Sequence, residues 1–175
     1  MPQNDQALLT RLKDNGLEFV VIGGVCVVYH GAPLATFDLD ICCRFGEPNL
    51  RRIQDAMRDL NPVHRLTPQK LPFELTPHLC ASLKNLYLQT DLGKLDCLGE
   101  VAGIGDYDAV LKQSVLAEFS YGEFRFLSLD GLIAAKQAAG RERDLAALRH
   151  LLAIKERISR RQNGPQTPPH TPLTS

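Results

Sequence analysis

One stretch of the sequence, FVVIGGVCVVYHGAPLATFDLDI at residues 19–41, constrains the fold more than any other. The segment LEFVVI at residues 17–22 is short and rich in β-branched residues, which predicts a buried strand rather than a helix. Gly23 and Gly24 then turn the chain into a short helix. In TFDLDICCRF, residues 36–45, apolar and polar residues alternate, so we expect a second strand with one apolar and one polar face.

The polar face of this second strand carries two carboxylates, Asp38 and Asp40. Residues i and i+2 of a strand project from the same face, with Cα atoms about 6.5–7 Å apart, so both side chains point to one place. Unpaired, they would repel each other and resist ionisation. A divalent cation such as Mg²⁺ or Mn²⁺ removes both objections, because it prefers hard oxygen ligands. A solvent-facing strand edge, where aspartate costs little, is the alternative.

The glycine turn favours the metal interpretation. A strand that runs through two glycines into a helix exposes backbone N–H groups at the positive end of the helix dipole, and a phosphate can approach the main chain there. Thirteen residues separate Gly24 from Asp38, which would place a phosphate site beside the metal pair. Asp96, in the apolar segment GKLDCL, is expected in another strand and would add a third carboxylate. Asp91, nearer the turn, is its rival.

The other segments complete an α/β (α+β) pattern. Helices are expected at residues 4–16, 48–60, 107–114 and 129–161, the last with a break at Gly140, and hairpins at 85–101 and 115–129. Residues 62–81 carry four prolines and give no clear pattern. We expect one domain at residues 1–161, with a core at 17–128 and C-terminal helices at 129–161, followed by a disordered tail at 162–175.

Composition limits the possible partners. The chain has 20 basic and 20 acidic residues, a formal net charge of zero, so any contact with nucleic acid is expected to be local. Its five cysteines form no C-x-x-C pair, which indicates buried thiols in a reducing compartment. A signal-peptide core and an apolar run of roughly 20 residues are both absent from the sequence, so we expect a cytoplasmic protein without a membrane partner.

The glycine turn, the acid pair and the third acid together resemble the nucleotidyltransferase superfamily, which includes DNA polymerase β and small bacterial and archaeal transferases. The matching segments are Ile22-Gly23-Gly24, Asp38-Leu39-Asp40-Ile41 and Leu95-Asp96-Cys97. A later segment, SLDGLIAAKQAAGRERDLAAL, resembles the Lys-and-(Arg)-Asp helix motif of the AbiEii-like toxin branch, with Lys136 and Asp144 on the motif positions and Arg141 between them. The resemblance covers residues 17–152.

This resemblance implies a nucleotidyltransferase fold, with a mixed sheet flanked by helices and a C-terminal helical segment. It implies a metal-dependent enzyme that moves a nucleoside monophosphate from an NTP to a hydroxyl of RNA, tRNA or a small molecule and releases pyrophosphate. A toxin paired with an antitoxin protein is one version of this function. The alternative is a catalytically inactive, nucleotide-binding regulatory module of the same fold.

Roles for single residues follow from the same resemblance. Asp38, Asp40 and Asp96 would hold Mg²⁺ or Mn²⁺, and Asp96 would also help to deprotonate the acceptor. The amides of Gly23 and Gly24 would hold the triphosphate, whose charge Lys136 would neutralise.

Other roles remain open from the sequence. Lys136 either contacts phosphate or extends from a helix surface into solvent. Asp144 either belongs to the site, pairs with Arg141, or is an acid at a helix N-terminus. Thr36 either contacts a phosphate or begins the strand. The basic residues of the last helix form either a solvated face or an RNA-binding stripe; they are Arg141, Arg143, Arg149, Lys155, Arg157, Arg160 and Arg161.

Overall fold

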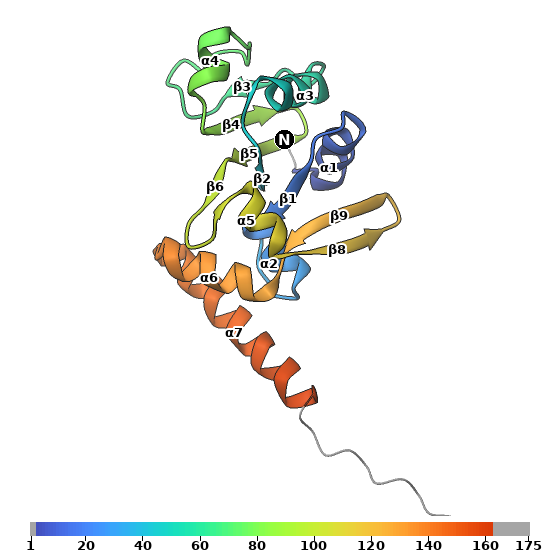
Figure 1. Ribbon diagram of the computed structural model, residues 1–175, viewed down its shortest axis with the longest axis vertical. Coiled ribbons are helices and arrows are strands. Elements are labelled where there is room, and N and C mark those ends of the chain that lie inside the picture. Colours follow the sequence, from blue (N-terminus) through green and yellow to red (C-terminus); the bar gives the residue numbers. More distant parts are fainter. Residues whose placement is uncertain (1–2, 163–175) are drawn as a thin grey trace, which may run out of the picture.

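The computed structural model describes residues 3–162, and within them seven strands form one sheet in the order β3-β4-β5-β2-β1-β9-β8 (Figure 1). These strands are β1 Phe19–Ile22, β2 Leu39–Cys43, β3 Val63–His64, β4 Asn85–Thr90, β5 Gly93–Leu98, β8 Ser114–Phe119 and β9 Gly122–Leu127. Two further strands, β6 Glu100–Val101 and β7 Gly105–Asp106, pair with each other. The expected tail lies, apart from its first residue, outside the described residues.

The sheet is mixed, as the sequence predicted. β2 is antiparallel to β1 and parallel to β5, while β1 is parallel to β9. β4–β5 and β8–β9 are antiparallel hairpins. The central strands β1 and β2 are almost wholly buried because neighbouring strands and helices cover them. Buried thiols contribute to this core at Cys26, Cys42, Cys43 and Cys97, whereas Cys80 is half-buried.

Helices flank the sheet. They are α1 Asp5–Asp14, α2 Gly23–Tyr29, α3 Glu47–Met57, α4 Pro77–Ser82, α5 Tyr107–Lys112, α6 Leu129–Ala139 and α7 Glu142–Gln162. α2 packs on β1 and β2, and α5 on β1, β2 and β9. α6 and α7 pack against each other, and α7 then runs away from the sheet (Figure 1). Within the described chain, none of these helices combines the length and apolarity that a bilayer-crossing segment needs.

The predicted elements differ from the structure mainly at their ends. α3 ends at Met57 rather than at residue 60. β2 begins at Leu39, whose partner in the ladder with β5 is Leu95, and its ladder with β1 starts one residue later at the pair Ile22↔Asp40. Phe37 therefore lies in the preceding loop and is 72% exposed, so its expected place on the apolar strand face was wrong. The unassigned segment 62–81 holds β3 and α4.

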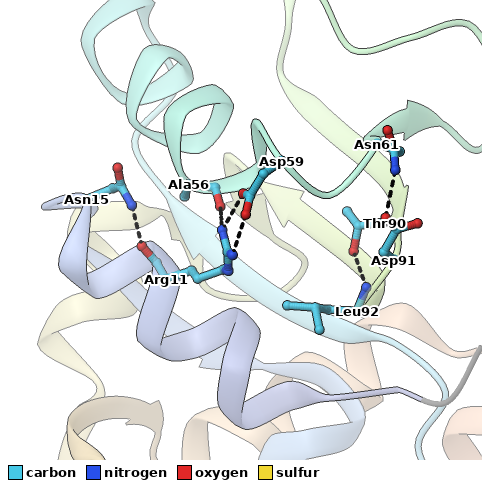
Figure 2. A network of polar contacts seen from close by, with 8 residues as sticks. All are labelled: Arg11, Asn15, Ala56, Asp59, Asn61, Thr90, Asp91 and Leu92. Carbon is cyan, nitrogen blue, oxygen red and sulfur yellow. Dashed lines mark hydrogen bonds and ion pairs between the residues drawn. The ribbon is translucent and has the colours of Figure 1, made fainter.

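Polar contacts tie α1 to the end of α3, and the segment after α3 to the β4–β5 turn (Figure 2). One Arg11 nitrogen donates to the Ala56 carbonyl at 3.1 Å, and the guanidinium donates to both Asp59 oxygens at 2.6 and 2.7 Å. Close by, the Asn61 amide donates to an Asp91 oxygen at 2.7 Å. Together these contacts connect α1, the segment that follows α3 and the β4–β5 turn.

The packing of α7 can be tested with two adjacent leucines. Leu151 is fully buried against the core, whereas Leu152 is 44% exposed. We expect Leu151→Ala to lower the free energy of unfolding by about 2–4 kcal/mol, because it leaves a cavity. Leu152→Ala should cost less than about 1 kcal/mol. Urea denaturation followed by circular dichroism measures both, and equal losses would show that α7 is packed differently.

Candidate active site

Three carboxylates converge at the centre of the sheet. In the ladder between β2 and β5, Asp40 is the direct partner of Asp96, and Asp38 lies just before β2. One oxygen from each of the three lies within 4.8 Å of the others. The structure therefore brings together the three acids that the sequence singled out, and their role as metal ligands stays a prediction.

The rival third acid lies elsewhere. Asp91 is an exposed residue of the β4–β5 turn, where its carboxylate accepts the hydrogen bond from Asn61 (Figure 2). Asp96, by contrast, is only 5% exposed. Strand register decides between the two acids, because Asp96, and not Asp91, is the direct partner of Asp40 in the ladder between β2 and β5.

Glycine is required at residue 23 by the acid beside it. Gly23 has φ +63°, and a Cβ there would lie 1.9 Å from an Asp40 carboxylate oxygen. The amide of Gly24 donates a hydrogen bond to the Asp40 carboxylate. One of the two amides expected to hold phosphate thus already has a carboxylate acceptor, and the turn is built around Asp40.

Burial, and after it electrostatic repulsion, raises the pKa values of two acids of the cluster, Asp40 and Asp96. Burial, followed by the charges of Asp38 and Asp96, raises the pKa of Asp40 to about 6, against the Gly24 hydrogen bond and the Lys136 charge, which lower it. Burial also raises the pKa of Asp96, although Arg65 opposes this. The three carboxylates fit a hard divalent cation such as Mg²⁺ or Mn²⁺, because such an ion takes carboxylate oxygens as ligands and its positive charge would offset their mutual repulsion.

Lys136 and Asp144 form an ion pair between α6 and α7. The Lys136 ammonium lies 2.6 Å from an Asp144 oxygen, and the two side chains are 18% and 5% exposed. Lys136 therefore does not extend into solvent. Asp144 lies in the first turn of α7 and takes Lys136 as its ion-pair partner instead of Arg141.

A pocket of about 590 Å³ opens in front of the acid pair. This volume lies within the range of about 300–1,000 Å³ that is usual for ligand sites. Its polar lining contains Gly23, Gly24, Thr36, Asp38, Asp40, Lys136, Arg141 and Asp144. Thr36 lies in the loop before β2, so it does not begin the strand. Asp96 is not part of the lining, although its two neighbours in the sheet row, Asp40 and Tyr87, both are.

Sequence analysis missed the cationic partner of the third acid. Arg65 directly follows β3, and its Nε donates to Asp96 Oδ1 at 3.0 Å while its Nη2 donates to Oδ2. Its guanidinium carbon also lies 5.5 Å from the centre of the Tyr87 ring. Arg65 falls in the proline-rich segment without a clear pattern, and no periodicity there could have revealed it.

Comparison with known proteins places the fold. No family model matches this chain, and no curated protein matches it. A solved structure of a proposed nucleotidyltransferase from Thermotoga maritima is similar, with a TM-score of 0.52 and 20% sequence identity, over 83% of this chain and 88% of that one. The chain therefore has a nucleotidyltransferase-like fold, and the AbiEii-like branch stays a prediction.

The turn around Asp40 gives a first test. We expect Gly23→Ala to lose more stability than Gly31→Ala, whose Cβ would meet nothing within 4 Å although its φ is +97°. Both changes carry a backbone cost of about 1–2 kcal/mol, but only Gly23→Ala must also displace Asp40. Urea denaturation measures the stability of each variant. Similar losses for both would contradict the close contact.

The raised pKa of Asp40 gives a second test. Because the folded state binds this proton more tightly than the unfolded state, the metal-free protein should lose stability as pH rises from 4 to 6. Asp40→Asn should therefore increase the free energy of unfolding by about 1–3 kcal/mol at pH 8, and give no gain at pH 4. Asp59→Asn, at an exposed ion pair, is the control and should not stabilise. A loss of stability in Asp40→Asn at pH 8 would contradict this electrostatic account.

Proposed function

We propose that this protein is a metal-dependent nucleotidyltransferase that transfers a nucleoside monophosphate from an NTP to an acceptor hydroxyl and releases pyrophosphate. The observation that carries the proposal is the convergence of three carboxylates within 4.8 Å beside the glycine turn. Two of these acids line a pocket of about 590 Å³ that also contains a lysine. The fold likeness to the Thermotoga maritima protein supports the same reaction class.

The acids would hold the metal. Asp38 and Asp40 line the pocket and would bind Mg²⁺ or Mn²⁺, with Asp96 as the third ligand. When bound, two such ions stabilise the charge on the entering and leaving oxygens of an in-line displacement. Because this chemistry depends mainly on positioning and charge, few other protein groups are needed.

The proposed reaction forms one bond, breaks one bond and moves one proton to a carboxylate of the chain. The acceptor oxygen forms a bond to the α-phosphorus, and the bond from that phosphorus to the bridging oxygen breaks, so pyrophosphate leaves. The acceptor proton passes to a carboxylate of the cluster. Asp96 is the base that the resemblance suggests, but Arg65 donates to both of its oxygens and it is not part of the pocket lining. Asp38 and Asp40 are therefore better placed to receive this proton.

The triphosphate would lie between the glycine turn and α6. Gly23 carries no side chain of its own, but the Asp40 carboxylate lies against it, so a phosphate would approach the main chain beside this carboxylate. Lys136 lines the same pocket, and its charge lowers the pKa of Asp40. Thr36 and Arg141, which also line the pocket, are further candidate contacts, and Asp144 would act by holding Lys136.

The acceptor is either a tRNA or other RNA end, as for an AbiEii-like toxin with an antitoxin partner, or a small-molecule alcohol. The neutral net charge favours a small local contact over a large RNA-binding surface. Both acceptor classes use the same hydroxyl chemistry and the same cluster.

One experiment tests the proposal against the inactive, nucleotide-binding alternative. The protein is incubated with Mg²⁺, each labelled NTP, and total tRNA or a metabolite pool, and pyrophosphate release is measured. Asp38→Ala combined with Asp40→Ala should lower the rate roughly 100-fold or more, because the metal ligands are lost.

Asp91→Ala is the matched control, because it removes the exposed turn acid and should leave the rate unchanged. Equal release by the wild type and the double variant would rule out catalysis at this cluster. Magnesium-dependent NTP binding without pyrophosphate release would favour the regulatory module.

A further inference from the structure

One row of residues crosses the sheet from the acid cluster to its edge. In the strand ladders Asp40 is the partner of Asp96, and Asp96 is the partner of Tyr87. The row continues to Arg65, whose backbone N–H donates to the Tyr87 carbonyl at 3.0 Å. Two acids, an aromatic ring and a guanidinium therefore lie on neighbouring strands, with Arg65 at the end away from the glycine turn.

We propose that Arg65 is a positioning residue that acts through Asp96 as a permanent counter-cation of the acid cluster. Its positive charge would keep the cluster from binding its full set of divalent cations until a triphosphate adds negative charge. The inference rests on the proposed function, because the cation in question is the one that the transferase would use.

The contact geometry supports this role. The Arg65 guanidinium donates to both Asp96 oxygens, and the side chains are 23% and 7% exposed. Two hydrogen bonds from one guanidinium to the two oxygens of one carboxylate form a contact that is both strong and directional. It therefore fixes the orientation of the third carboxylate before any cation arrives.

The same contact does not block a metal. Each carboxylate oxygen has two lone pairs, so Asp96 can accept from Arg65 and still coordinate an ion. The ion and the guanidinium would then share one carboxylate, and their charges repel each other. Arg65 thus opposes cation binding without preventing it, and the negative charge of a nucleotide would offset the repulsion.

A second arginine provides a matched control. The Arg44 guanidinium lies 4.5 Å from the centre of the Tyr107 ring and pairs with Asp108, so it repeats the arginine–tyrosine–aspartate arrangement outside the acid cluster. A change at Arg44 removes the same charge at an exposed site, where the guanidinium pairs with Asp108 and Glu18. It should not change cation binding at the cluster.

The test is a titration with Mn²⁺ alone, followed by electron paramagnetic resonance, on wild type and three variants. Arg65→Gln keeps a hydrogen-bond donor but removes the charge, and should bind Mn²⁺ roughly tenfold more tightly than wild type. Arg65→Lys keeps the charge without the two paired hydrogen bonds, and should stay within about twofold of wild type. Arg44→Gln should match wild type.

Unchanged or weaker Mn²⁺ binding by Arg65→Gln would overturn the inference, since a purely structural arginine predicts that result. If Arg65→Gln does not fold, a large loss of affinity in Arg65→Lys would overturn it instead, because orientation rather than charge would then dominate. A wild type that binds no Mn²⁺, with or without NTP, would refute the proposed function itself. Normal wild-type binding with no effect in Arg65→Gln refutes the inference alone.

Discussion

Repulsion among three carboxylates, one buried and two half-buried, is the constraint on which the rest of the site depends. Asp38, Asp40 and Asp96 approach within 4.8 Å of one another, and the pKa of Asp40 rises to about 6 as a result of burial and these neighbours. A cluster of this kind persists only if the surrounding structure supplies compensating charge or hydrogen bonds. The surroundings do so from three directions, through the Gly24 amide, Lys136 and Arg65.

These compensating groups come from distant parts of the chain. Gly24 lies in the first turn of α2, Arg65 follows the two-residue strand β3, and Lys136 lies on α6. Sheet topology brings them together, because β5 lies between β4 and β2 and so places Asp96 between the glycine side and the β3 side. The C-terminal helices and the irregular segment around β3 are therefore both needed to balance the charge of the site.

Local sequence patterns predicted the parts of the site that lie within one element. Alternation placed Asp40 on β2 and Asp38 directly before it, and the double glycine marked the turn, whose need for glycine the structure explains by the Asp40 side chain. Register and tertiary pairing could not be predicted in the same way. The match of Asp96 to Asp40 depends on a parallel ladder between strands that are far apart in the sequence, and Arg65 enters from a strand too short to leave a periodicity. Phe37 was misplaced because the ladders of β2 with β5 and β1, rather than alternation, set where the strand begins.

The buried pair of Lys136 and Asp144 decides how a lysine could serve a triphosphate here. Separating the pair would leave Asp144, with a side chain only 5% exposed, without its partner, and such a loss costs about 3–5 kcal/mol. A lysine ammonium has three donors, however, and Asp144 accepts one of them. Lys136 can therefore contact a phosphate while it stays bound to Asp144. It would act as a fixed positive charge held between α6 and α7, and would not need to move when nucleotide binds.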